Sequence, residues 1–156
     1  MAQNTAKSRP SDPKDLLRAG IFLLQRDEAR EAVRALEEAS RLDPASAIIQ
    51  SYLGLAMASA RAGTKEAIRL CREAVERETF HAELFLNLGK VHLMAGDRRQ
   101  ARLAFLEGLK LDREDPELLR CLQTIGMRKD PPLRFLHRNH PLNKHLGIAL
   151  RRLRLR

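Results

Sequence analysis

Few side chains in this chain of 156 residues have types and spacings that could support chemistry. His137, His140 and His145 are the one cluster of candidate metal ligands, but no cysteine or carboxylate completes a zinc set with them. Cys71 and Cys121 are far apart and predict reduced core thiols rather than a disulfide framework. No phosphate-binding loop, nucleophile elbow or pair of catalytic carboxylates occurs. The sequence therefore predicts a protein that is not an enzyme and that needs no metal or cofactor.

The net charge of +9 is concentrated at the end of the chain. Residues 116–156 contain ten Lys or Arg and two Asp or Glu, a net charge of +8, and the rest of the chain is nearly neutral. Any electrostatic role must therefore belong to the C-terminal quarter. No secretory signal opens the sequence, and no window approaches the roughly 18 apolar residues of a membrane-spanning helix. These features predict a cytoplasmic protein.

The elements that would position these side chains repeat with a period of about 34 residues. Gly20, Gly54 and Gly89 are 34 and 35 residues apart, and alanines 32, 67 and 101 follow them by 12, 13 and 12 residues. Each period has two apolar stripes at i, i+3, i+4 and i+7 around a short turn, which predicts a pair of helices. We therefore expect an all-α protein built from stacked helix pairs.

The repeating residues resemble the tetratricopeptide repeat over positions 13–115. In the first period the family pattern falls on Leu16, Ala19, Gly20, Leu23, Ala32, Leu36, Ala39 and Pro44. In the second it falls on Gln50, Leu53, Gly54, Met57, Ala67, Cys71 and Ala74. In the third it falls on Phe85, Leu88, Gly89, His92, Ala101, Phe105 and Gly108. Gln50 departs from the pattern, because a large apolar residue is expected there. The chain as a whole is similar to small bacterial tetratricopeptide-repeat proteins with three repeats and a basic tail.

This resemblance implies an all-α superhelix, or α-solenoid, of helix-turn-helix units with a C-terminal capping helix and a tail helix. We expect a disordered N-terminus at 1–12, repeats at 13–46, 47–81 and 82–115, a capping helix at 116–126, and a basic tail at 127–156. The tail should contain an amphipathic helix from about residue 141.

The recurring spacing of the glycines within the chain predicts close contact between the two helices of each repeat. A glycine inside a helix costs about 1 kcal/mol relative to alanine, so its recurrence suggests a steric need. We expect Ala32, Ala67 and Ala101 to lie opposite these glycines. In the second and third repeats, Gly63 and Gly96 are the residues that should end the first helix. His92 should be a packed core residue.

The first helices of the repeats should align into a concave groove that binds another protein, as the resemblance implies. Helical periodicity assigns the following residues to this groove: Leu17, Arg18, Ile21, Gln25, Ile48, Tyr52, Leu55, Leu86, Asn87, Lys90 and Met94. We expect Leu17, Tyr52 and Lys90 to be exposed, whereas Leu24, Ala58 and Leu93 could equally pack between helices. The apolar character of the set suits an amphipathic helix or an extended apolar segment.

Relatives that clamp the C-terminal carboxylate of chaperones carry lysines, asparagines and an arginine at five groove positions. Here the corresponding residues are Leu17, Ile21, Tyr52, Glu83 and Asn87. Four of them lack the required chemistry, so the sequence argues against a carboxylate clamp.

The basic tail leaves three interpretations open. Its charged residues include Lys144, Arg151, Arg152, Arg154 and Arg156. The tail could dock on the repeats as a further cap, lie on anionic lipid as a peripheral membrane contact, or bind nucleic acid or an acidic protein. Specific nucleic-acid binding is disfavoured, because no aromatic platform or reading motif accompanies the charge. Self-association, with the tail of one molecule in the groove of another, would give a homo-oligomer.

Overall fold

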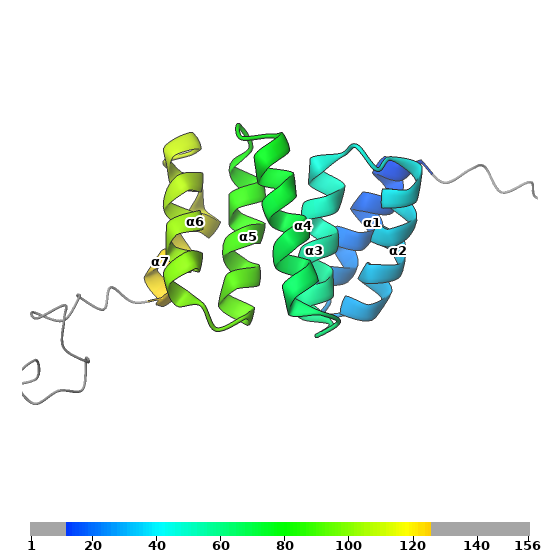
Figure 1. Ribbon diagram of the computed structural model, residues 1–156, viewed down its shortest axis with the longest axis horizontal. Helices are drawn as coiled ribbons and strands as arrows, with labels where there is room; N and C mark the ends of the chain where they lie inside the picture. Colours follow the sequence, from blue (N-terminus) through cyan, green and yellow to red (C-terminus); the bar gives the residue numbers. More distant parts are fainter. Residues whose placement is uncertain (1–11, 126–156) are drawn as a thin grey trace, which may run out of the picture. The chain divides into compact units, whose positions relative to one another are not determined.

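The computed structural model describes residues 12–125, and every element in that range is an α-helix. The seven helices are α1 (Pro13–Gln25), α2 (Ala29–Leu42), α3 (Ala47–Ser59), α4 (Thr64–Arg77), α5 (Ala82–Met94), α6 (Arg98–Leu111) and α7 (Pro116–Ile125). Consecutive helices form three helix-turn-helix pairs, followed by α7 (Figure 1). The prediction of an all-α array of stacked helix pairs is therefore confirmed for the described residues.

Several helices begin where a short polar side chain can satisfy free backbone N–H groups. Asp12 accepts a hydrogen bond from the backbone N–H of Lys14 at the start of α1, and Pro13 follows it at the first helical position. Ser46, Asp97 and Asp115 accept equivalent bonds at the starts of α3, α6 and α7. Asp-Pro and Ser-Ala sequences thus begin new helices here, because the side chain of the capping residue accepts a hydrogen bond from a backbone N–H that has no partner within the helix.

The first helix of each pair ends in the same way. The residue after the last helical turn is in the left-handed region, with φ of 60° at Asp27, 56° at Arg61 and 81° at Gly96. The following N–H then donates back to the carbonyl five residues earlier, for example Ala62 to Met57 at 2.8 Å. The prediction for Gly96 is confirmed, but the prediction for Gly63 is wrong. Arg61 ends α3, and Gly63 instead precedes α4 with φ of 96°.

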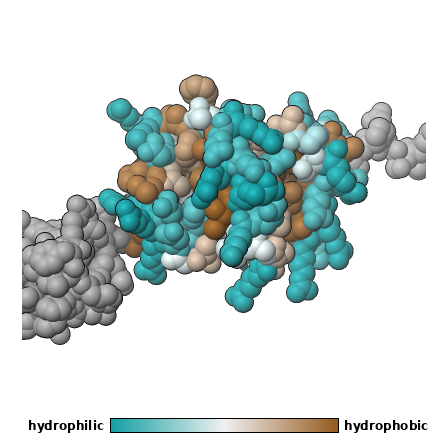
Figure 2. Space-filling model, in the orientation of Figure 1, coloured by the Kyte–Doolittle hydropathy of each residue, from teal (hydrophilic) through white to brown (hydrophobic). Residues whose placement is uncertain are grey.

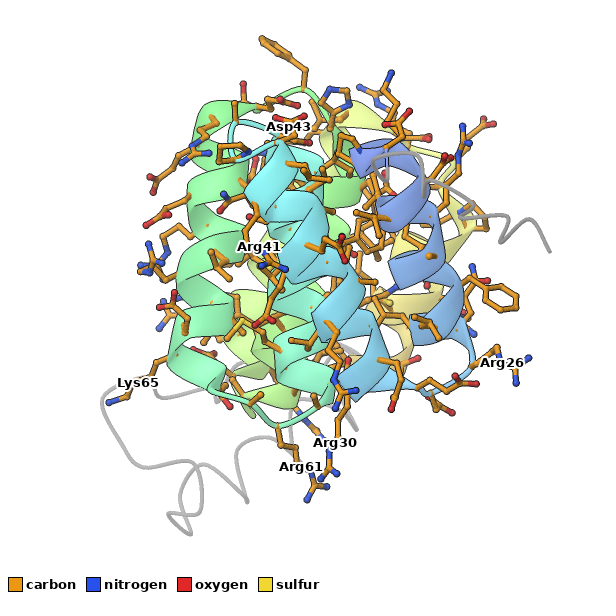
Figure 3. All side chains as sticks on the ribbon, turned by 90° about the vertical axis from the view of Figure 1, so that its right-hand side faces the viewer. Arg26, Arg30, Arg41, Asp43, Arg61 and Lys65 are labelled. Carbon is orange, nitrogen blue, oxygen red and sulfur yellow. The ribbon has the colours of Figure 1, made fainter. Side chains whose placement is uncertain are left out.

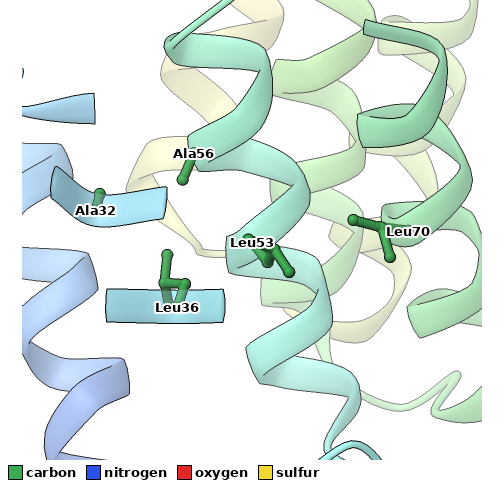
Figure 4. Packing of buried hydrophobic residues seen from close by; sticks show 5 residues of the cluster. All are labelled: Ala32, Leu36, Leu53, Ala56 and Leu70. Carbon is green, nitrogen blue, oxygen red and sulfur yellow. The ribbon is translucent and has the colours of Figure 1, made fainter. Parts of the chain in front are cut away.

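The core lies along the seams between the helices. Ala32 and Leu36 of α2 pack against Leu53 and Ala56 of α3, and Leu70 of α4 completes the cluster (Figure 4). Similar clusters join α3 to α4 and α5, and α5 to α6 and α7. Each repeat therefore buries apolar surface between its own two helices and also against its neighbours, as expected for a solenoid.

The glycines inside the first helices are sites of close helix contact, but the residues opposite them differ from the prediction. A Cβ added at Gly20 would lie 2.5 Å from Leu36 Cγ, and one added at Gly89 would overlap the ring of Phe105. At Gly54 the neighbours are Cys71 Sγ at 2.6 Å and the carbonyl oxygen of Ala67 at 2.8 Å. The side chain one turn after each alanine, which is Leu36, Cys71 or Phe105, thus fills the space opposite the glycine. The prediction that the alanines lie there holds only in part, at Gly54.

Charged side chains gather near the turns within the first two helix pairs (Figure 3). In the end view, labelled side chains point away from the helices near the turns within the pairs, namely Arg26, Arg30, Arg61 and Lys65 (Figure 3). Phe22 of α1 is exposed beside Arg26, whose guanidinium carbon lies 5.5 Å from the ring centroid.

Several predictions concern residues outside the described range. These are most of the N-terminal segment 1–12, the last residue of the predicted capping helix at 126, the tail helix, the histidine cluster and the basic residues Lys144, Arg151, Arg152, Arg154 and Arg156. Asp12 alone of the N-terminal segment is described, as the cap of α1. Among residues 12–125 no helix is long and apolar enough to cross a membrane.

Candidate functional site

The predicted binding residues lie on the first helices of the three pairs, which are α1, α3 and α5. Together with the adjoining α7, these helices form a surface that we call the A-helix face. Its elements are α1, α3, α5 and α7, and side-chain contacts join each helix to the next. Because every helix presents the same positions to this face, the residues fall into rows across the array. The side chains of these rows are mainly apolar on α1 and α3, whereas polar contacts join α3 to α5 and α5 to α7.

The part of the face formed by α1 and α3 is apolar and only half covered. Leu17, Ile21, Ile48 and Tyr52 are each of intermediate exposure. Leu17 and Tyr52, which the sequence predicts to be exposed, are instead partly buried at the edge of the cluster that joins the first two repeats, and Leu24 packs there too. We call Leu17, Ile21, Ile48 and Tyr52 the apolar patch. Arg18 and Gln25 are exposed beside it, and Arg18 pairs with Asp15 at 3.2 Å.

Three residues predicted to line the groove are instead buried. Leu55 and Leu86 retain 7% and 6% of their exposure, and Asn87 retains 1%. Leu55 packs with Val91 and Cys71, and Leu86 packs with Phe105 and Leu118. These positions fall into the seams between neighbouring helices, so they support the face rather than contact a ligand directly. Ala58 is buried as well, whereas Met94 is exposed.

Polar contacts tie α3 to α5. The amide of Asn87 donates to Ser51 Oγ at 3.2 Å, and both side chains are buried. The hydroxyl of Tyr52 donates to the carboxylate of Glu83, and Ser59 Oγ lies 3.8 Å from Met94 Sδ. Burial, together with the bond to Glu83, raises the pKa of Tyr52 above its ordinary value, so the phenol stays protonated and donates.

A second set of polar contacts ties α5 to α7. Lys90 Nζ lies 2.6 Å from Glu117 Oε1, and Arg120 lies 3.7 Å from the same carboxylate. Lys90 was predicted to be exposed, but its side chain is partly covered by this pair. The sequence pattern does not predict these pairs, although Glu83 and Glu117 are the second residues of α5 and α7 respectively. This shared position is the signal that could have found them.

The thiols and the buried histidine of the array have environments typical of core residues. Burial raises the pKa of Cys71 to about 12, and its Sγ lies 3.3 Å from the carbonyl oxygen of Ser51. His92 is buried as predicted, burial lowers its pKa, and its Nδ1 has no hydrogen-bond partner among the described residues. No group of three His, Cys, Asp or Glu within residues 12–125 is arranged to hold a metal ion.

Comparison with known proteins identifies the fold. No protein-family model matches the chain. The TPR repeat-containing protein YpiA of Bacillus subtilis is 26% identical over 115 residues, which cover 73% of this chain but only 26% of that protein. This chain thus spans about a quarter of the length of that curated relative.

Solved structures of tetratricopeptide-repeat domains are similar to this chain in fold. The first TPR domain of human RPAP3 superposes with a TM-score of 0.64 at 16% identity, over 75% of this chain and 91% of that domain. The first TPR of Spaghetti, bound to the HSP90 peptide SRMEEVD, gives 0.61 at 15% identity, over 75% of this chain and 92% of that one. The chain has the tetratricopeptide-repeat fold, and the resemblance seen in its sequence is confirmed.

Proposed function

We propose that this protein is a non-catalytic interaction scaffold whose A-helix face binds a segment of another protein. The observation that carries the proposal is the apolar patch, in which two apolar side chains one turn apart on α1 and two on α3 stay partly exposed. Such a surface favours apolar anchors presented at helical or extended spacing. Peptide binding by similar folds, such as the Spaghetti domain with its HSP90 peptide, supports the same class of function.

The ligand should be apolar rather than an acidic C-terminus. Glu83 places a carboxylate at one of the positions where a clamp needs a cation, and Tyr52 and Asn87 engage Glu83 and Ser51 rather than pointing free donors outward. An incoming carboxylate would meet like charge at Glu83. We therefore propose that leucine-type side chains of the partner contact Leu17, Ile21 and Ile48. Tyr52, whose hydroxyl donates to Glu83, forms the edge of the apolar patch towards α5.

Selection from a random peptide library displayed on phage, with the full-length chain as bait, tests this proposal. Enriched peptides should carry apolar residues at i, i+3 or i+4, and i+7, or alternating along an extended segment. Ile21→Glu and Ile48→Glu should each weaken binding of the best peptide by at least about tenfold, because each places a charge where an apolar anchor docks. Leu86 is unsuitable for this test, since a charge at that buried position would disturb the fold.

Leu42→Glu is the matched control, because Leu42 is an exposed leucine of α2, outside the A-helix face. Its binding should equal that of the unaltered chain, and helical circular dichroism should be the same for all variants. Enriched peptides that are acidic and keep their affinity for Ile21→Glu and Ile48→Glu would refute the proposal. The cytoplasmic location and the roles considered for the basic tail stay predictions.

A further inference from the structure

The outer faces of α2, α4 and α6 carry different residues at equivalent positions. The buried alanines 32, 67 and 101 align these helices, and the positions two and five residues later are exposed in each of them. At these positions α2 has Arg34 and Glu37, α4 has Arg69 and Arg72, and α6 has Leu103 and Leu106. The same two surface sites are therefore charged in two repeats and apolar in the third.

The two leucines of α6 form an apolar stripe on the surface of the described unit. Leu103 is 46% exposed and Leu106 is 37% exposed, and they lie one turn apart on the same side of the helix. In the space-filling view, brown apolar surface gathers over α6, whereas teal polar surface dominates over α4 and α2 (Figure 2). Neighbouring helices do not need these leucines for packing, since charged residues suffice at the same sites in α2 and α4.

The charges at the start of α6 are also of the sign that its helix dipole disfavours. The first turns of α2 and α4 contain Glu31 and Glu66, which interact favourably with the positive end of the helix dipole. The first turn of α6 contains no acidic residue and begins with Arg98 and Arg99, although Asp97 caps the helix from outside. Arg98, Arg99 and Arg102 form no ion pair with another residue of the range 12–125. Arg98 and Arg99 thus lie where the helix dipole disfavours cations, and Arg102 follows one turn after Arg98.

We propose that the outer face of α6 is a second docking surface, separate from the A-helix face, for an acidic amphipathic helix of a partner protein. Apolar side chains of that helix would cover Leu103 and Leu106, and its carboxylates would pair with Arg98, Arg99 and Arg102. Burying the leucines removes apolar area from water, and the carboxylates offset the unfavourable charge at the start of α6.

The charge pattern favours such a partner over a second copy of this chain. Arg99 lies one turn before Leu103 and Lys110 one turn after Leu106, so both flank the stripe on its own side of the helix. If two α6 helices paired through their leucines, a parallel arrangement would face Arg99 with Arg99, and an antiparallel one would face Arg99 with Lys110. The parallel arrangement brings like charges together. In the antiparallel one, Lys110 is already paired with Glu107 of its own helix at 2.7 Å, so the second copy offers Arg99 no carboxylate that is not already paired. The leucines also disfavour nucleic acid, because phosphates would leave them without an apolar contact.

Fluorescence anisotropy with three synthetic helical peptides of about four turns tests the proposal on the full-length chain. One probe has leucine at i, i+3, i+4 and i+7 and glutamate elsewhere. The second replaces glutamate with lysine, and the third replaces leucine with serine. The leucine–glutamate probe should bind at least about tenfold more tightly than either of the other two, since it alone satisfies both the apolar stripe and the arginines.

Variants locate the binding site. Leu103→Arg with Leu106→Arg, which gives α6 the residues of α4, should weaken the leucine–glutamate probe by at least about tenfold. Arg98→Glu with Arg102→Glu should do the same and should also remove most of the dependence of binding on salt. Leu42→Arg, at a leucine that is 50% exposed on α2, should leave binding unchanged. Because arginine already occupies both positions in α4, the first variant should keep the helical spectrum and melting temperature.

Four results would overturn the proposal. One is binding of the leucine–glutamate probe that survives Leu103→Arg with Leu106→Arg, and another is equal binding of the serine–glutamate probe. A third is loss of probe binding in Ile21→Glu but not in the α6 variants, which would assign the probe to the A-helix face. The fourth is a concentration-dependent dimer in sedimentation that the α6 variants abolish, which would make a second copy the occupant.

Discussion

The two halves of the A-helix face use similar backbone for different purposes. Across α1 and α3 the residues are apolar and half exposed, whereas from Tyr52 through α5 to α7 the side chains bond to one another across the helix seams. The first half thus keeps apolar surface available for a ligand, and the second half holds its helices in register. A repeat array can therefore separate binding from support although every unit has the same fold.

The largest expected effect tests the close helix contacts on which both halves depend. Gly89→Ala places a Cβ against the ring of Phe105, which is fully buried, so it should destabilise the chain by about 3 kcal/mol. Gly20→Ala meets the more adaptable side chain of Leu36 and should cost about 1–2 kcal/mol. Urea unfolding of both variants measures the difference. Equal and negligible losses would mean that the glycines are not needed for close contact.

The second prediction concerns the support role of the polar half. Asn87→Leu removes the partner of Ser51 Oγ in a buried site and should cost about 1–3 kcal/mol. Adding Ser51→Ala to Asn87→Leu removes the unsatisfied hydroxyl and should recover part of that loss. Thermal unfolding of the two single variants and the double variant gives the coupling. Strict additivity would show that the hydrogen bond contributes nothing.

A smaller change in stability is expected at His92 of α5, whose buried Nδ1 has no hydrogen-bond partner among residues 12–125. Leu23 occupies the equivalent position in the first repeat, so His92→Leu should stabilise the chain by about 1 kcal/mol. The lowered pKa of His92 means that the unfolded state binds its proton first as the pH falls through about 6.5. The stability of the unaltered chain should therefore decline from pH 7 to pH 5 by more than that of His92→Leu. Urea unfolding at both pH values measures the two losses. Equal losses of unfolding free energy for the unaltered chain and for His92→Leu would contradict this prediction.

The smallest effect is expected at the end of α3, in the first half. Arg61 has φ of 56°, a conformation that glycine adopts more easily and that Gly96 adopts at the equivalent site. Arg61→Gly should stabilise the chain by about 0.5–1 kcal/mol, because the left-handed strain of a side chain outweighs the added freedom of the unfolded chain. Arg72→Gly, at an exposed position inside α4, is a contrasting control that should lose a comparable amount. A lower melting temperature for Arg61→Gly would contradict the assignment of strain.

The fold could be predicted from the sequence because its signals repeat. The spacing of Gly20, Gly54 and Gly89 and the paired apolar stripes reflect close contacts between the two helices that every unit must make. What the pattern could not give was the depth of each residue in a seam. Leu55 and Leu86 share a helical face with Leu17 and Ile21, and only the packing of neighbouring helices decides which are buried. The pairs Tyr52–Glu83 and Lys90–Glu117 were missed because they join helices whose rotation is set by that packing.

The central claim, that the apolar patch is the binding site, is tested most directly by mapping a bound peptide at residue level. The experiment is a ¹⁵N–¹H correlation titration of the full-length chain with the peptide selected from the displayed library. The account predicts that amide shifts cluster in α1 and α3, around Leu17, Ile21, Ile48 and Tyr52, and are absent in Ile21→Glu. Shifts confined to α5, α6 and α7, with α1 and α3 unchanged, would contradict it.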